Sequence, residues 1–146
     1  MLAPAAISFL MSGAWPLNAA PIKGVTPAIL ARLTSAPARI VSKLIAAGAK
    51  LDPLDRVKKN AAIYAAGSGC GACLAELLRA GTPVNARLDN EETLLMWASG
   101  YGHESAVNFL LQQGADRGLK DNRGKTAADI ARDGNFTAVI KLLEKI

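Results

Sequence analysis

Two cysteines are the residues of this chain whose spacing most directly suggests chemistry. Cys70 and Cys73 form a C-x-x-C motif and are the only cysteines in the sequence. Such a pair can be a redox centre, half of a zinc site or a local disulfide. A structural zinc site would need carboxylates to complete its four ligands, and a thioredoxin-like role needs a strand–helix–strand setting that this motif lacks. A disulfide, two inert small residues and a thiol-disulfide or redox-sensing role stay open as alternatives.

The single histidine, His103, lacks the partners that catalysis or metal binding would require. The spacing of residues along the chain suggests no Ser-His-Asp or Cys-His arrangement. The phosphate-binding patterns G-x-x-x-x-G-K-[ST] and, after a strand, G-x-G-x-x-G do not occur. We therefore expect His103 to make a structural hydrogen bond. We expect a non-enzymatic protein with no catalytic residue, cofactor or metal ion.

The elements that must hold these residues follow a repeat. Leu44-Ile45, Leu77-Leu78 and Leu110-Leu111 recur at one constant interval, and each pair is followed three positions later by glycine. A fourth pair, Leu142-Leu143, comes one position earlier than this interval requires, as Gly134 does after Gly102. This predicts a one-residue deletion between residues 131 and 134. A fixed period of 33 residues indicates stacked repeats.

Each repeat is predicted to hold two short helices. In the unit that starts near Ala86, residues 93–99 form the first helix, residues 100–102 break it, and residues 104–113 form the second. Gly114 can close that second helix in the left-handed conformation. The sequence is 51% apolar but only 5% aromatic, which favours a core of small aliphatic side chains between closely packed helices.

At these residues the sequence resembles the ankyrin repeat family, whose unit of about 33 residues carries a T-P-L-H-x-A signature. Residues 93–98 read T-L-L-M-W-A where the signature belongs, and residues 126–131 read T-A-A-D-I-A. The resemblance implies an all-α solenoid over residues 23–146. It would comprise a degenerate cap at residues 24–52 and repeats at residues 53–85, 86–118 and 119–146.

Two positions of the repeat unit depart from the family pattern, the glycine of the turn and the threonine of the signature. Glu91 and Lys58 stand where Gly124 fits the glycine of the family's turn, and Asn60 replaces the threonine of the signature. Turns without glycine either bend differently or accept the left-handed conformation at a cost. We expect the architecture to tolerate both.

The resemblance also implies a binding surface, because ankyrin repeats usually bind partners on the concave side made by the loop tips and the first helices. Tyr101 is the strongest candidate, since tyrosine offers a large contact area with a polar end. Trp97 and Tyr64 occupy equivalent places and are expected to pack in the core. We expect a protein partner, bound by a monomer or by a subunit of a hetero-complex. The implied positions are Arg56, Val57, Lys59, Asp89, Asn90, Glu92, Tyr101, Asn122, Arg123 and Lys125.

Charge is distributed unevenly along the chain. The sequence carries 17 basic and 12 acidic residues, a formal charge of +5. Residues 1–60 hold eight of the basic and two of the acidic residues, a balance of +6, while residues 61–146 are close to neutral. The basic residues are scattered singly and match no nucleic-acid motif, so we do not expect nucleic-acid binding.

The N-terminal segment, residues 1–22, contains no charge and is mostly apolar. It resembles the hydrophobic part of a secretory signal but lacks the basic start of one, so residues 1–22 are either a signal peptide or a flexible tail. Prolines and a glycine within the segment argue against a stable membrane span. The protein is expected to be secreted or periplasmic, as an exported bacterial member of the family, if residues 1–20 act as a signal, and otherwise cytoplasmic.

Overall fold

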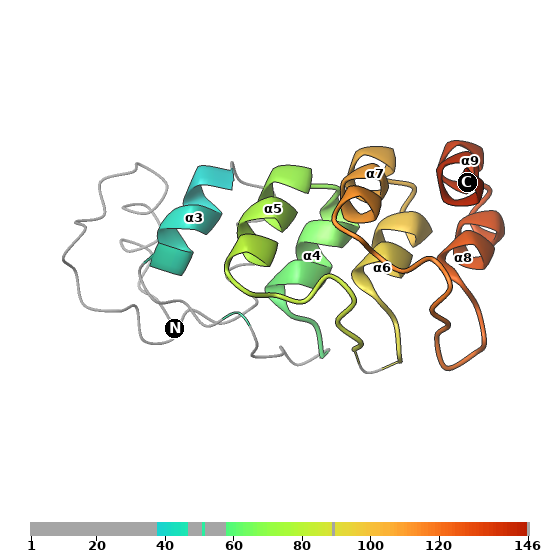
Figure 1. Cartoon of the computed structure of the whole chain (residues 1–146), viewed down its shortest axis with the longest axis horizontal. Coiled ribbons are helices and arrows are strands. Elements are labelled where there is room, and N and C mark those ends of the chain that lie inside the picture. The colour runs from blue at the N-terminus through green and yellow to red at the C-terminus, as the bar shows by residue number, and fades with distance from the viewer. Residues whose placement is uncertain (1–37, 47–50, 52–57, 89, 146) are drawn as a thin grey trace.

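The computed structural model describes residues 38–46, 51, 58–88 and 90–145, and these residues form helices and turns without any strand (Figure 1). This confirms the predicted all-α class. The candidate signal segment and most of the predicted cap lie outside the described residues. No helix within the described ranges is long and apolar enough to cross a membrane. The helices are α3 (Ala38–Ala46), α4 (Ala61–Ser68), α5 (Gly71–Arg79), α6 (Leu94–Gly100), α7 (Glu104–Gln112), α8 (Ala127–Asp133) and α9 (Thr137–Glu144).

The helices form two layers. α4, α6 and α8 pack side by side in an inner layer, and α3, α5, α7 and α9 form an outer layer (Figure 1). Each inner helix also packs against the outer helix that follows it in sequence. The boundaries of α6 and α7 match the predicted helices to within one residue at each end. Every described repeat therefore contacts mainly its neighbours, as expected of a solenoid.

The core lies between the two layers and is built from small aliphatic side chains. Leu77, Leu110 and Leu143 occupy the same place in successive outer helices, and none is more than 5% exposed. Their spacing is the same at both steps, whereas Leu142 is only partly buried. The buried leucine of the last repeat is therefore Leu143, and no shortening of the period is needed to place it.

The predicted one-residue deletion between residues 131 and 134 is wrong. In the second repeat, the turn between the two helices uses Gly102 at φ 73°. The residue that takes this conformation in the third repeat is Asn135, at φ 58°, one full repeat length later, while Gly134 keeps an ordinary negative φ. Asparagine is one of the few non-glycine residues that enter this region readily. Glycine was therefore a misleading marker for the turn.

The inner helices begin with equivalent side-chain caps. The hydroxyl of Thr93 accepts a hydrogen bond from the backbone N–H of Met96 at 3.3 Å, and Thr126 makes the same bond one repeat later. In the first repeat, where Asn60 replaces the threonine of the signature, the side-chain carbonyl of Asn60 accepts a hydrogen bond from the backbone N–H of Ile63 at 3.0 Å. Asparagine caps helices as well as threonine does, so this departure from the signature keeps the start of α4 in place.

Tight hairpins, which we call fingers, precede the inner helices. The second finger comprises residues 86–92 and the third residues 119–125, and of the first finger residues 58 and 59 are described. The tip residues Lys58, Glu91 and Gly124 have φ values of 56°, 59° and 77°. The two non-glycine turns thus adopt the left-handed conformation that the family's glycine would provide.

Candidate binding surface

A row of side chains at one position of the inner helices faces the fingers. Tyr64, Trp97 and Ile130 follow one another at the repeat interval in α4, α6 and α8, and each is partly buried. Trp97 packs against the core on one side. The prediction that Trp97 packs in the core therefore holds for only one side of the indole. The rest of the ring lines two surface pockets.

Trp97 is the centre of a stacked group. The ammonium of Lys59 lies 4.4 Å from the ring centroid of Trp97 and 5.7 Å from that of Tyr64, within the range of cation–π attraction. Tyr101 stacks on Trp97 with centroids 6.1 Å apart, and the ring of His103 follows at 6.3 Å from Tyr101. These contacts hold a flat aromatic surface along the second repeat.

A mainly apolar pocket lies on the α8 side of Trp97, with a volume of about 130 Å³. Ile130, which is shorter than its counterpart Trp97 one repeat earlier, lines this pocket from α8. Gly100 leaves space next to Ile130, since a Cβ at position 100 would come within 3.1 Å of Ile130 Cγ2. The lining consists of Glu92, Met96, Trp97, Gly100, Tyr101 and Ile130.

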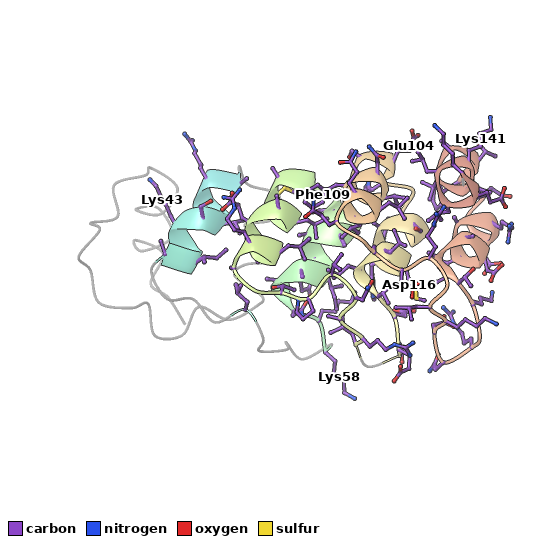
Figure 2. The ribbon with its side chains drawn as sticks, in the orientation of Figure 1. Lys43, Lys58, Glu104, Phe109, Asp116 and Lys141 are labelled. Carbon is purple, nitrogen blue, oxygen red and sulfur yellow. A yellow bond between two sulfur atoms is a disulfide. The ribbon has the colours of Figure 1, made fainter. Side chains whose placement is uncertain are left out.

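A second pocket lies on the other side of Trp97, between the first and second fingers. Its volume is about 230 Å³. Lys58 and Lys59 contribute from the first finger, and Asn90 and Glu92 from the second. Figure 2 shows the Lys58 side chain extending outward beyond its finger. Two basic residues therefore stand at this pocket, while the neighbouring pocket is largely hydrocarbon.

The second and third fingers are joined by backbone and by charge. The N–H of Asn122 donates to the carbonyl of Asn90 at 3.0 Å. Arg123 pairs with Glu92 at 3.4 Å and with Asp121 at 2.6 Å. The carboxylate of Glu92 is thus partly neutralised from the third finger.

Asp121 organises the third finger from inside. One carboxylate oxygen accepts the backbone N–H groups of Arg123 and Lys125, both at 2.9 Å, and the other accepts the guanidinium of Arg123. Burial by itself raises the pKa of Asp121, but the hydrogen bonds and the charge of Arg123 outweigh it, so the net pKa lies below the usual 3.8. The carboxylate therefore remains charged and holds the loop closed.

Most predicted surface residues come together at the fingers and the inner helices. Tyr101 is 55% exposed and is the one exposed large hydrophobic side chain within the described ranges. The Lys125 ammonium pairs with Asp133, away from the two pockets. The positions at this face are Lys59, Asn90, Glu92, Tyr101, Asn122, Arg123 and Lys125, while Arg56, Val57 and Asp89 lie outside the described residues.

Comparison with known families agrees with this geometry. The model of a family described as ankyrin repeats, in three copies, matches residues 29–121 and again residues 63–146. The chain belongs to the ankyrin repeat family. The resemblance in the sequence and the stacked helix pairs thus have one explanation.

Curated relatives match the chain only over a segment. The NAD-capped RNA hydrolase NUDT12 of Homo sapiens is 37% identical over 60 residues, which is 41% of this chain and 13% of the hydrolase. NUDT12 of Macaca fascicularis gives the same figures. Alpha-latrotoxin-Lg1a of Latrodectus geometricus is 31% identical over 61 residues, or 42% of this chain and 4% of the toxin. The similarity is therefore to a small part of much longer proteins.

His103 connects two ankyrin repeats, as expected of a structural histidine. Its Nε2 lies 2.7 Å from the carbonyl oxygen of Gly67, and because a carbonyl only accepts, Nε2 carries the proton. The ring also covers Gly69, where a Cβ would come within 2.7 Å of Nδ1. Within the described residues, no three His, Cys, Asp or Glu side chains gather as a metal site.

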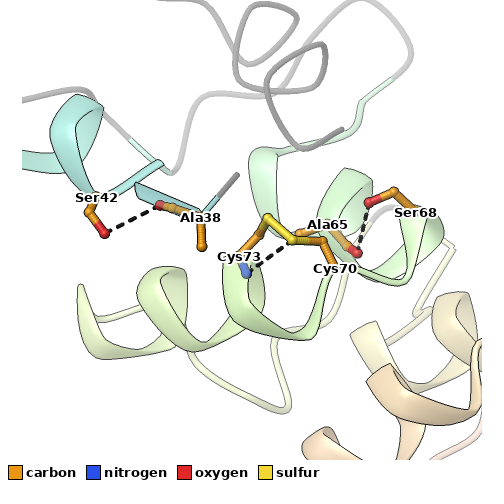
Figure 3. The surroundings of a disulfide bond; sticks show 6 residues. All are labelled: Ala38, Ser42, Ala65, Ser68, Cys70 and Cys73. Carbon is orange, nitrogen blue, oxygen red and sulfur yellow. Dashed lines mark hydrogen bonds between the residues drawn. A yellow bond between two sulfur atoms is a disulfide. The ribbon is translucent and has the colours of Figure 1, made fainter. Parts of the chain in front are cut away.

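The two cysteines form a disulfide at the start of α5 (Figure 3). Their Cα atoms are 5.2 Å apart. Cys70 is the residue that caps α5, its Sγ accepting the backbone N–H of Cys73 at 3.2 Å, and Cys73 is fully buried. The helix starts at Gly71, so Cys73 lies within its first turn. Among the three alternatives, this geometry corresponds to the local bridge.

Seven residues that line the two pockets are not among the predicted binding positions: Lys58, Ile63, Leu88, Met96, Trp97, Gly100 and Ile130. Ile130 could have been found by adding one repeat length to Trp97. Met96 and Gly100 gave no such signal, because a methionine and a glycine in a short helix are equally compatible with plain core packing.

Proposed function

We propose that this protein is a non-enzymatic binding module whose inner face, formed by the fingers and α4, α6 and α8, holds a protein partner. The exposed ring of Tyr101 carries this proposal, because it lines one of the two pockets that flank Trp97. Aromatic side chains next to pockets are where binding energy concentrates in protein interfaces. The catalytic activity in the name of the RNA hydrolase is not part of this proposal, because the match covers 13% of that protein.

Rigid presentation is the proposed mechanism. The backbone bond between Asn122 and Asn90 and the buried carboxylate of Asp121 support the fingers without a partner. Side chains that already hold their positions lose less conformational entropy when a partner docks. We therefore expect binding without a large rearrangement of the helices.

A capture experiment from the native compartment tests the proposal. Tagged wild-type protein, Tyr101→Ala and Asn90→Arg are used as bait, and captured proteins are quantified by mass spectrometry. Both substitutions lie at exposed inner-face positions and are expected to reduce capture of the main partner about tenfold, which corresponds to about 1.4 kcal/mol.

A matched control separates a local effect from a general one. Asn108 is exposed on α7 in the outer layer, so Asn108→Arg makes the same chemical change on the opposite side. It should leave capture unchanged. Equal capture by wild type, Tyr101→Ala and Asn90→Arg would contradict the proposed face.

A thiol-disulfide or redox-sensing role through Cys70 and Cys73 is the alternative proposal. The cysteine pair at the start of α5, with Cys70 partly exposed, supports it. Reduction and reoxidation would then alter function, and Cys70→Ser with Cys73→Ser would abolish it. Under the binding proposal the double variant keeps its partner. Alkylation of the native protein without reductant should label neither cysteine if the bridge is present.

We also propose that residues 1–20 act as an export signal, which would place the protein outside the cytoplasm, where disulfides persist. N-terminal sequencing of the mature protein from its native host tests this. A chain that still starts at Met1 would contradict export by cleavage and favour a tail on a cytoplasmic protein.

A further inference from the structure

We propose that the bridge between Cys70 and Cys73 is a thiol-exchange site that opens to incoming thiols through Cys70 only. A thiolate from outside attacks Sγ of Cys70, and Sγ of Cys73 is the sulfur that is released. The class of substrate is a molecule with an accessible thiol. This inference rests on the alternative proposal of a thiol-disulfide role, and it specifies which sulfur reacts and with what.

The two cysteines differ in exposure. Cys70 lies in the turn between α4 and α5 and is partly exposed, whereas Cys73 is fully buried in the core. The helix α3 packs against α5 near the bridge (Figure 3). Because the rate of thiol–disulfide exchange depends on access to the sulfur that is attacked, an outside thiol reaches the bridge through Cys70.

The start of α5 favours release of the other sulfur. Cys73 is the third residue of this helix, so its sulfur leaves as a thiolate within the first turn. Backbone N–H groups at the start of a helix carry partial positive charge and stabilise a negative charge beside them. One of them, the N–H of Cys73, already donates to Sγ of Cys70 at 3.2 Å. The helix therefore stabilises the charge that exchange creates.

The exchange balances with the incoming thiol as the reductant. A bond forms between the incoming sulfur and Sγ of Cys70 while the bond between the two cysteine sulfurs breaks. The electron pair of the broken bond passes to Sγ of Cys73, which takes up the proton that the incoming thiol has lost. A second thiol on the same molecule then attacks the incoming sulfur, so that the molecule leaves as a disulfide and Cys70 and Cys73 remain as two thiols.

A molecule with a single thiol follows a different course. The Cα atoms of Cys70 and Cys73 are 5.2 Å apart, so the released thiol of Cys73 stays within reach of the mixed disulfide. Its attack on Sγ of Cys70 closes the bridge again and expels the incoming thiol. Replacing Cys73 by serine removes this return path, so the mixed disulfide on Cys70 should then persist.

Adduct mapping on the full-length oxidised protein tests which sulfur is attacked. The protein is incubated with excess glutathione, quenched with acid, denatured and alkylated with N-ethylmaleimide. Both cysteines lie in one tryptic peptide, residues 60–79, and its fragment ions separate them. Glutathione on Cys70 should exceed glutathione on Cys73 about tenfold or more. Equal amounts, or a folded bridge that glutathione opens only in denaturant, would overturn the inference.

Single-cysteine variants provide a second measurement. Reduced Cys73→Ser should react with oxidised glutathione about tenfold faster than reduced Cys70→Ser, because only the former keeps the accessible thiol. In denaturant the two rates should be equal, which shows that burial causes the difference. If a variant has a lower melting temperature, the adduct map of the wild type decides. Ala72→Ser changes an exposed residue of the same turn and should leave exchange unchanged.

The source of the thiol is identified in the native host. Cys73→Ser is purified with free thiols blocked at lysis, and its adducts are analysed by mass spectrometry. Glutathione on Cys70 indicates a small thiol, and a protein that reductant releases indicates a cysteine of a partner. Cys70→Ser is the matched control and should carry neither. Equal adducts on both variants, or none on Cys73→Ser, would contradict the inference.

Failure of this inference and failure of the proposed role can be told apart. Exchange at Cys70, together with full function of the double serine variant, would leave the exchange site standing and contradict a thiol-disulfide role. Loss of function in the double variant, without any preference between the two sulfurs, would contradict this inference and leave the role standing. The capture experiment decides the proposed inner face separately.

Discussion

Asp121 shows how one buried side chain shapes the binding face. Its carboxylate closes the third finger on two backbone N–H groups and fixes Arg123, which in turn reaches Glu92 of the second finger. Removing the charge would therefore loosen one finger and the link to its neighbour. The effect should be moderate, because Arg123 is more than half exposed and water screens its pair.

The pH dependence of stability can test the role of Asp121. Asp121→Asn should lower the free energy of unfolding by about 1 to 2 kcal/mol at pH 7. Because the folded pKa of Asp121 lies below the usual 3.8, its charged form stabilises the fold above that pH, and this contribution is lost as pH falls through the folded pKa. Urea unfolding from pH 7 to pH 2 should show the gap between wild type and variant closing only below about pH 4. A gap independent of pH would contradict this role.

Single residues of the site were predictable only where family position or side-chain type marked them. Tyr101 follows from its type and its place after the first helix of the repeat. The pairing of Arg123 with Asp121 could not be predicted, because both lie in a finger whose side-chain directions depend on the closed turn. The pocket beside Ile130 could not be predicted, because its shape depends on how the side chains of α6 and α8 pack against one another.

At the scale of elements, the turns between inner and outer helices determine how repeats stack. At Gly69 and Gly102 the backbone is left-handed, and an aromatic ring of the following repeat lies over the glycine. A Cβ on Gly102 would stand 2.4 Å from the ring of Phe136. These glycines therefore serve both the turn and the contact between repeats.

A series of glycine-to-alanine substitutions separates these effects. Gly71→Ala, in α5 with open space around it, should be neutral or stabilising by up to about 1 kcal/mol. Gly114→Ala meets no atom within 4 Å but has φ 85°, so it should cost about 1 kcal/mol. Gly102→Ala adds the clash with Phe136 and should cost clearly more. Denaturant midpoints give the order, and equal midpoints for Gly102→Ala and Gly114→Ala would argue against the ring contact.

Both layers contribute large buried side chains to the core, and those of the outer helices include Leu74, Leu77 and Leu110. Leu110 on α7 is fully buried, so Leu110→Ala should destabilise the protein by about 2 to 5 kcal/mol. Leu111, its neighbour, is only partly buried, and Leu111→Ala should cost less. Chemical denaturation followed by circular dichroism measures both. A midpoint unchanged by Leu110→Ala would contradict the register of the repeats.

Helix positions were largely predictable from the sequence, because leucine pairs and glycines recur with the period of the fold. The predicted helices at residues 93–99 and 104–113 differ from α6 and α7 by at most one residue at each end. The predicted deletion near the end of the last repeat is wrong because Gly134 does not form the left-handed turn there. Asn135, which can adopt the same left-handed backbone, occupies that position in the last repeat.

At the scale of the whole molecule, the stacking of repeats turns residues one repeat length apart into neighbours on one surface. Tyr64, Trp97 and Ile130 form a row only because α4, α6 and α8 lie side by side. The same stacking places the first finger, with Lys58 and Lys59, beside a second finger that carries Glu91 and Glu92. Specificity would then come from the sequence of finger and inner-helix residues, on a scaffold that contributes rigidity.

Site-specific photo-crosslinking in the native host tests the binding role of the inner face most directly. The photoreactive amino acid p-benzoylphenylalanine is placed at position 101 on the inner face or at position 108 on the outer layer, and adducts are identified by mass spectrometry after irradiation. We predict a discrete protein adduct from position 101 and none from position 108. An adduct from position 108 alone, or none from position 101, would contradict a binding surface at the fingers and inner helices.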